Sequence, residues 1–239
     1  MEIKPTKRNL RTGEVESSQS PCQVMMNNFI FYATASTKSA LIQYEVEICS
    51  LTPKECYSFE DKEKFRLLCA DGCMNYKMKW SCPPYSPSFR DFSLSWDMLY
   101  ILYLRVDTNQ FSYIKNDYLK IKAANSILKS RADKFLLRMA KQHGRYISTG
   151  SCRLCKPCKC KINIPCAHPD KMTFSFEALG IDVGALADMC FQKPLLWYKP
   201  KILPEYTSVV CGLLTNELLS ARYLQDEYLK SPENKLILK

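Results

Sequence analysis

The chain has 239 residues, of which 46% are hydrophobic and 24% charged, enough for one substantial core and ordinary for a globular protein. Residues 1–18 contain no apolar stretch, which argues against a secretory signal, and the longest apolar run, residues 99–106, is too short to span a bilayer. We therefore expect a cytoplasmic protein without membrane association. The formal net charge of +10 favours an acidic electron carrier or an anionic small molecule as partner, and nucleic acid less.

Thirteen cysteines dominate the chemistry of the sequence. In a reducing compartment they are not expected to form a disulfide framework, and clustered thiols there point to metal or redox chemistry. Eight of them fall into two groups. The other five are predicted to be buried thiols in the core: Cys22, Cys49, Cys56, Cys190 and Cys211.

Taken in chain order, the predicted elements follow a flexible polar tail over residues 1–24. A short helix over residues 37–44 and a strand over residues 46–48 come first. Residues 58–69 are then predicted to form a helix that Ser58 caps, with negative charge in its first turns. This helix has the first clustered cysteine at its end.

Turn-forming residues follow this helix. Asp71-Gly72 predicts a tight turn, and Pro83-Pro84 ends any regular structure. A further helix is predicted over residues 88–95, and the apolar run over residues 99–106 is typical of a buried central strand.

A long helix is predicted from residue 116 or 117 to about residue 142, with Gly144 as its C-terminal cap. A short strand over residues 146–149 follows. The helix has one apolar stripe at three- and four-residue steps, formed by Ile121, Ala124, Leu128, Ala132, Phe135 and Met139. We expect this stripe to pack in the core.

Two short helices are predicted after the second cysteine group. Ser175 caps a turn that ends at Gly180, and Asp182 caps the helix after it. Residues 207–215 are predicted as a strand, and Asn216 begins a terminal helix or extension. Since helices and buried-type strands alternate, we expect a mixed α/β (α+β) fold.

The expected architecture is a single domain over residues 25–239. It has one central mixed sheet flanked by helices, and two cysteine-rich metal-binding loops.

The first cysteine group has the pattern C-x3-C-x8-C, formed by Cys69, Cys73 and Cys82. Three thiolates on one loop can bind three irons of a [4Fe–4S] cubane. The fourth iron then needs another ligand, for which Cys49 and Cys56 are candidates, or stays open to substrate. Proline directly after the last cysteine stiffens the loop and also occurs in the bacterial ferredoxin run.

The second group begins with C-x2-C-x2-C, formed by Cys152, Cys155 and Cys158. This spacing matches the first three ligands of the bacterial ferredoxin run, although the position of its fourth cysteine is not a cysteine here. Cys166 can close the site. Cys160 competes with it, but a C-x-C step makes it hard for Cys158 and Cys160 to reach one cluster, so Cys166 is preferred.

Zinc is the main rival metal. Structural zinc usually pairs two short knuckles across a longer spacer, and four ligands within fifteen residues leave little room for that. We therefore predict two [4Fe–4S] clusters, with Zn²⁺ and metal-free thiols as alternatives. Arg153 and the neighbouring lysines are predicted to stabilise an anionic cluster, or else to be solvated loop charges. Trp80 is predicted to shield a cluster from water.

Both groups resemble a known family, the cysteine-rich predicted metal-binding proteins of domain-of-unknown-function family 2284. The resemblance rests on CADGCMNYKMKWSCPPYSP and GSCRLCKPCKCKINIPCAHPDKMTFSFEALGIDV, within roughly residues 45–215. The family pattern does not include Cys160. It ends in S-x-E-x-x-G-I-D-V, which Ser175, Glu177, Gly180 and Asp182 match. The resemblance implies seven metal ligands: Cys69, Cys73, Cys82, Cys152, Cys155, Cys158 and Cys166.

Two functions compete. The first is an iron–sulfur protein of anaerobic metabolism with a redox or electron-transfer role. In one version this protein is an enzyme with an open iron at the three-cysteine site, and Glu177 is its candidate catalytic acid/base. The alternative is that Glu177 is only an acidic residue in the first turn of a helix, where the helix dipole stabilises it. The second is a zinc-stabilised binding module whose basic face meets nucleic acid or an acidic protein, with Trp80 stacking on bases. Two histidines and seven glycines give little support to a hydrolytic triad or a phosphate loop.

Overall fold

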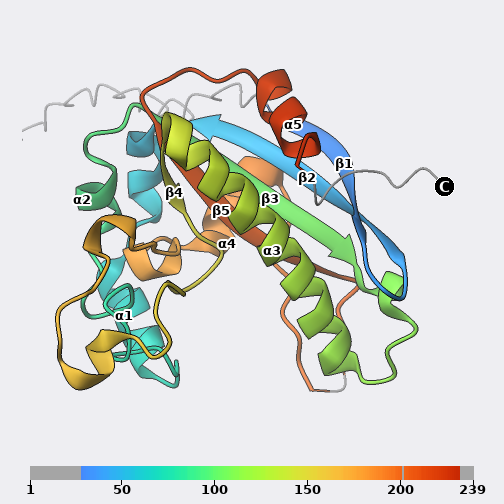
Figure 1. The fold of residues 1–239 in the computed structure, drawn as a ribbon, viewed down its shortest axis with the longest axis horizontal. Helices are drawn as coiled ribbons and strands as arrows, with labels where there is room; N and C mark the ends of the chain where they lie inside the picture. Colours follow the sequence, from blue (N-terminus) through green and yellow to red (C-terminus); the bar gives the residue numbers. More distant parts are fainter. Residues whose placement is uncertain (1–27, 201, 232–239) are drawn as a thin grey trace, which may run out of the picture.

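The computed structural model describes residues 28–200 and 202–231, and within them the chain forms one five-stranded sheet with helices on both faces (Figure 1). The order of the strands is β1-β2-β3-β5-β4. They are β1 (Phe29–Ser36), β2 (Leu41–Leu51), β3 (Met98–Asp107), β4 (Gly144–Ile147) and β5 (Tyr206–Thr215). The mixed α/β class is confirmed. The predicted tail over residues 1–24, and Cys22 within it, lie outside the described residues.

All four strand pairings are antiparallel, whereas the sequence predicted a mixed sheet. The reason is the place of β5. The long helix α3 (Asp117–His143) does connect two strands that run in the same direction, β3 and β4. However, β5 lies between these two strands and runs opposite to both.

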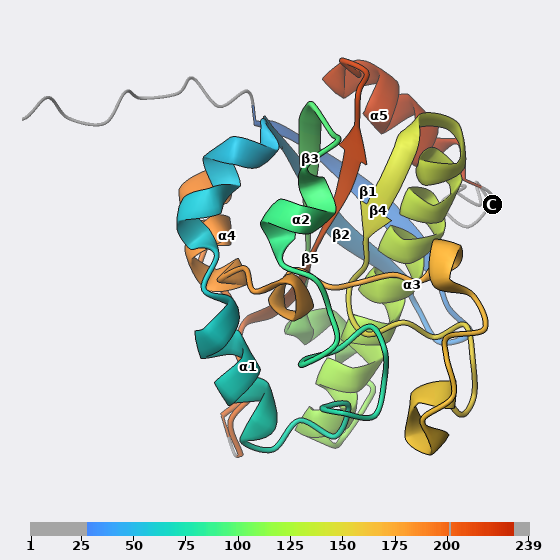
Figure 2. The same ribbon diagram turned by 90° about the vertical axis from the view of Figure 1, so that its left-hand side faces the viewer.

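Helices cover both faces of the sheet. One face carries α3 and α5 (Ala221–Leu229). The other carries α2 (Phe89–Ser93), α4 (Val183–Phe191) and two 3-10 turns, η1 (Pro53–Phe59) and η5 (Glu177–Leu179). Figure 2 shows these two layers on opposite sides of the strands. The remaining helix, α1 (Lys62–Ala70), has no buried residue and lies at the end of the molecule away from α5.

The central strand β3 explains the long apolar run of the sequence. Successive side chains of a strand point to opposite faces. Leu102 and Leu104 therefore pack in the core with α3, and Ile101 and Tyr103 in the core with α4. Because both faces are covered, almost every position of this strand is buried, as predicted.

The long helix α3 also agrees with the prediction. The side chain of Asn116 accepts a hydrogen bond from the backbone N–H of Leu119 at 3.0 Å, and Gly144 is the C-terminal cap. A side chain at Gly144 would collide with the backbone oxygen of Leu214, 2.0 Å from an ideal Cβ. The six residues of the predicted apolar stripe are all buried.

Two local predictions were wrong. The helix expected over residues 37–44 is instead the turn and second strand of a hairpin. The hydroxyl of Thr37 accepts from the N–H of Ala40 and donates to its carbonyl, which closes the turn, and alternate burial then favours a strand. The helix expected from Ser58 begins at Lys62, because Asp61 accepts from the N–H of Lys64 at 2.9 Å and caps it.

The other elements lie close to their predicted places. Ser88 caps α2, Asp182 caps α4, and Ser220 caps α5. The hydroxyl of Ser175 accepts from the N–H of Ala178 at the start of η5. Within the described residues, no helix combines the length and the apolar character needed to cross a membrane.

Gly180 gives a stability prediction. Its φ is +90°, and an added Cβ would lie 2.8 Å from the Cα of Lys62. Left-handed strain and a collision between two backbones both oppose a side chain there. We expect Gly180→Ala to lower the free energy of unfolding by about 2 kcal/mol, measured by urea denaturation. Gly150→Ala is the control, because a Cβ at Gly150 meets no atom within 4 Å. Equal midpoints for the two variants would contradict the prediction.

Candidate metal centre

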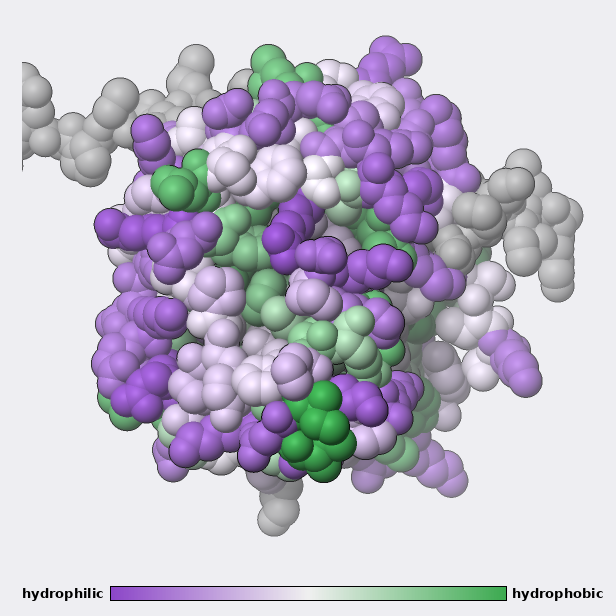
Figure 3. Space-filling view, turned by 60° about the vertical axis from the view of Figure 1, so that its left-hand side comes forward, coloured by the Kyte–Doolittle hydropathy of each residue, from purple (hydrophilic) through white to green (hydrophobic). Residues whose placement is uncertain are grey.

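The clustered cysteines lie on two loops at one end of the molecule. The first cysteine loop, residues 69–87, follows α1, and the second cysteine loop, residues 150–169, follows β4. Figure 2 shows both loops away from α5. On the face drawn in Figure 3, hydrophilic residues cover most of the surface, and hydrophobic ones emerge between them in a band and in separate patches.

The first cysteine loop folds back on itself through local hydrogen bonds. Cys69 lies in the last turn of α1, and its carbonyl accepts from the N–H of Cys73 at 3.1 Å. Gly72 between them has a φ of +113°, as expected for the predicted tight turn. At the other end, the N–H of Cys82 donates to the carbonyl of Lys79 at 3.1 Å. Cys82 is buried, Cys69 half-buried and Cys73 exposed.

These three thiols interact electrostatically. Burial raises the pKa of Cys69, and the charges of Cys73 and Glu177 raise this pKa further. Burial also raises the pKa of Cys82 to about 11, although the hydrogen bond with the Ser81 hydroxyl acts to lower this pKa. Without metal the Cys69 and Cys82 thiols therefore hold their protons at neutral pH, and a metal must displace these protons to bind.

The second cysteine loop holds four half-buried thiols and one buried thiol. The half-buried ones are the predicted ligands Cys152, Cys155, Cys158 and Cys166. Cys160 is only 2% exposed, and its Sγ donates to the carbonyl of Lys77 in the first loop at 3.4 Å. This contact gives Cys160 a packing role and agrees with its exclusion from the predicted ligands.

Further hydrogen bonds dock the two loops on each other. The indole N–H of Trp80 donates to the carbonyl of Ile164 at 2.9 Å. The ammonium group of Lys79 donates to the carbonyl of Cys152 at 2.9 Å, and the N–H of Cys152 donates to the hydroxyl of Ser81 at 3.2 Å. Residues from far apart in the sequence therefore form one cysteine-rich unit.

A shallow, open cavity of about 390 Å³ lies beside the docked loops. The rings of Trp80 and Tyr85 form an aromatic pair there, with centroids 4.7 Å apart. Its lining residues are Trp80, Tyr85, Asn163, Pro165, Cys166 and Met172. Aromatic rings beside a thiol exclude water, which fits the shielding role predicted for Trp80.

The donor chemistry of this unit fits a thiolate-bound metal. Soft thiolates select iron–sulfur clusters and zinc over oxygen-preferring cations. Within residues 28–200 and 202–231, no three Cys, His, Asp or Glu side chains already converge in metal-binding geometry. Binding therefore requires side chains of the two loops to turn toward a common centre, and the seven-ligand assignment stays a prediction.

Two other predicted site residues lie beside this unit. Arg153 is exposed between the thiols of the second loop. Glu177 is half-buried at the start of η5, and this turn is tied to the first loop, because the hydroxyl of Ser86 donates to the carbonyl of Ala178 at 2.5 Å. The structure thus brings η5, which contains Glu177, against the first cysteine loop. The role of Glu177 as an acid/base stays a prediction.

The four predicted core thiols that the structure describes are buried, as expected. Cys49, Cys56 and Cys190 are in the core between the sheet and α4, and Cys211 is in the opposite core. The burial of Cys49 and Cys56, with Cys190 as their neighbour, argues against both as a fourth ligand of the first loop.

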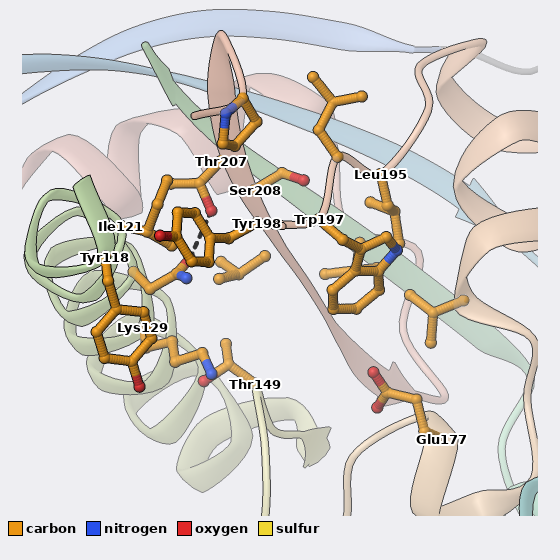
Figure 4. Close-up of a pocket in the computed structure, with 16 residues that line it drawn as sticks. Tyr118, Ile121, Lys129, Thr149, Glu177, Leu195, Trp197, Tyr198, Thr207 and Ser208 are labelled. Carbon is orange, nitrogen blue, oxygen red and sulfur yellow. Dashed lines mark hydrogen bonds between the residues drawn. The ribbon is translucent and has the colours of Figure 1, made fainter. Parts of the chain in front are cut away.

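Sequence reasoning missed a second cavity, of about 350 Å³, which has Glu177 at one end (Figure 4). Lys129 and Trp197 also line it. The available sequence signal was weak. Lys129 directly follows the stripe residue Leu128, and Trp197 belongs to a segment without helix or strand periodicity.

The fold and this unit define a cysteine-rich α/β protein whose thiols are gathered on two docked loops. A family model described as "Predicted metal-binding protein (DUF2284)" matches residues 33–214. The chain therefore belongs to this family, as the resemblance implied. Searches of curated proteins and of solved structures found no significant match. Family membership supports metal binding and does not identify the metal.

Proposed function

We propose that this chain is an iron–sulfur protein with a redox or electron-transfer role, holding one [4Fe–4S] cluster on each cysteine loop. The observation that supports the proposal is the docking of the two loops, which brings the two groups of candidate thiol ligands to the same end of the molecule. When bound, such clusters supply one-electron transfer at potentials set by their ligands and surroundings.

The two loops have different tasks in this proposal. Cys152, Cys155, Cys158 and Cys166 form a closed four-thiolate site. The first loop offers three thiols and leaves one position for another ligand or a substrate. The charge of Glu177 raises the pKa of Cys69, and Glu177 is the proposed acid/base beside that position. This supports the version of the proposal in which the protein is an enzyme.

An acidic electron carrier is the proposed protein partner, in the cytoplasm of an anaerobic cell. Arg153, Lys156, Lys159 and Lys161 are all exposed around the thiols of the second loop. Such a basic surface steers an acidic protein toward the cluster. Exposure of Cys73 supports an anaerobic setting, because accessible thiolates are the ones most readily oxidised.

The zinc-stabilised nucleic-acid module has less support. Its stacking residue Trp80 already donates its N–H to Ile164 and packs against Tyr85. These contacts hold the indole within the loop unit and restrict the stacking on a base that this function requires.

Anaerobic purification followed by iron and sulfide quantification tests the proposal. We expect about eight irons and eight sulfides per chain, and about four of each in Cys82→Ala. EPR of the reduced protein should lose one signal in that variant. Met74→Leu is the matched control, since Met74 is 87% exposed in the same loop and should not affect metal content. A colourless protein with stoichiometric zinc, or one without iron, would refute the iron–sulfur assignment.

A further inference from the structure

The cavity of Figure 4 lies between α3, β5 and the segment that follows α4. Lys129 and Thr149 are on one side of it, Trp197 is on the other, and Glu177 is at the end nearest η5. Its volume of about 350 Å³ falls in the range of small-molecule sites.

Hydrogen bonds and ring contacts fix the walls of this cavity. The Tyr206 hydroxyl donates to the carbonyl of Pro194 at 2.7 Å, and Thr108 donates to that of Pro204 at 2.6 Å, so both ends of the segment after α4 are anchored. In its middle, the ring of Tyr198 lies 5.8 Å from that of Tyr118 on α3. The cavity is therefore a built feature of the fold.

The charges of the cavity are asymmetric. Lys129 is half-buried, and its ammonium group makes no hydrogen bond or ion pair with another residue in ranges 28–200 and 202–231. The carboxylate of Asp133, one turn further along α3, instead accepts hydrogen bonds from the N–H and the hydroxyl of Thr149, at 3.1 and 3.0 Å. A half-buried ammonium group without a protein partner favours an anion from solution. Glu177, at the far end, offers a hydrogen-bond acceptor.

The rest of the lining suits the body of an organic molecule. Val183 and Leu195 are apolar, and Trp197 presents a side chain that is 73% exposed at the rim. Thr207 is a polar group of the wall, but its hydroxyl already donates to the amide oxygen of Asn125 at 2.8 Å. The lining therefore selects a flat apolar body more than a highly hydroxylated one.

We propose that this cavity binds a small organic anion with a flat apolar body, whose carboxylate pairs with Lys129 and whose body packs against Trp197. Glu177 lines the cavity and belongs to η5, which the hydrogen bond from Ser86 to Ala178 ties to the first cysteine loop, so one end of the cavity faces that loop. The assignment of this ligand as the substrate of a metal at the first cysteine loop rests on the proposed function. The binding of the ligand to the cavity does not depend on that function.

Calorimetric titration of the anaerobically purified full chain with 1-naphthoate tests this inference. The neutral 1-naphthalenemethanol serves as the matched probe without charge. Naphthoate should bind the wild type more tightly than the alcohol, and Lys129→Gln should weaken naphthoate binding by about tenfold while leaving the alcohol unchanged. Lys129→Arg should retain naphthoate binding. Trp197→Ala should weaken binding of both probes.

Lys141→Gln is the control for charge alone, because Lys141 is exposed on the same helix and does not line the cavity. Loss of naphthoate binding in this variant, equal affinity in Lys129→Gln, or no binding to the wild type would overturn the inference. Circular dichroism establishes that each variant is folded. If naphthoate binds as expected to a protein without iron, the proposed function fails and the binding site stands.

Discussion

Cys166→Ser should lower bound iron from about eight to about four atoms per chain, whereas Cys160→Ser should leave the iron content unchanged. The two thiols differ in their surroundings. Cys166 is half-buried and lines the cavity beside the two cysteine loops, next to Trp80. Cys160 is buried, and its Sγ donates to the carbonyl of Lys77. A serine hydroxyl can make the same hydrogen bond, so Cys160→Ser preserves the docking of the loops.

Iron and sulfide assays on anaerobically purified variants provide the measurement, with Cys155→Ser as the reference for loss of the closed site. Cys166→Ser should match this reference in iron content and in its EPR signal. The opposite pattern, with iron lost from Cys160→Ser and kept in Cys166→Ser, would assign Cys160 as the fourth ligand. The seven-ligand prediction would then be wrong at that position.

The cysteine spacing was enough to place the thiols on two loops, but not to show how the loops meet. Spacing is a local property, and it relates Cys69 to Cys73 and Cys152 to Cys155. The docking depends on tertiary contacts, such as that between Trp80 and the backbone of Ile164. Backbone carbonyls are present at every residue, so no sequence pattern marks the one that a distant side chain selects.

The fold was predictable where one signal dominates, as in the stripe of α3 and the apolar run of β3. The prediction from sequence failed where two signals compete. Around Thr37 small residues with moderate helix propensity conceal a turn, and only the alternation of Ile42, Tyr44 and Val46 indicates the strand. The antiparallel direction of β5 was not predictable locally, since it depends on where the chain returns after the second cysteine loop.

A partly buried ion pair is expected to contribute to the stability on the α4 side of the sheet. The ammonium group of Lys193 lies 2.6 Å from Glu45 Oε1 and 2.7 Å from Glu47 Oε2. Glu47 is only 3% exposed. We expect Lys193→Met to lower the free energy of unfolding by about 3 kcal/mol, because it leaves the Glu47 carboxylate buried without its cation. Urea denaturation at neutral pH measures this loss.

The pH dependence of this loss follows from the pKa of Lys193. Burial lowers this pKa, but hydrogen bonds to Glu45 and Glu47 outweigh burial and raise it above its ordinary value of 10.5. A raised folded-state pKa means that the stabilisation is complete below the unfolded pKa and is lost as pH rises through the folded pKa. The difference between wild type and Lys193→Met should therefore be constant around neutral pH and shrink only in strongly alkaline solution.

Lys230→Met is the control for an exposed pair, since Lys230 is 69% exposed in its contact with Glu227 and should leave the urea midpoint unchanged. Adding Glu47→Gln to Lys193→Met should recover part of the loss, because the buried charge is then gone. If the double variant is no more stable than Lys193→Met, the loss arises from packing. Lys193 also directly precedes Pro194, whose carbonyl anchors the segment that lines the cavity of Figure 4 from Leu195 onward. Lys193→Met should therefore also weaken naphthoate binding, which joins this ion pair to the proposed ligand site.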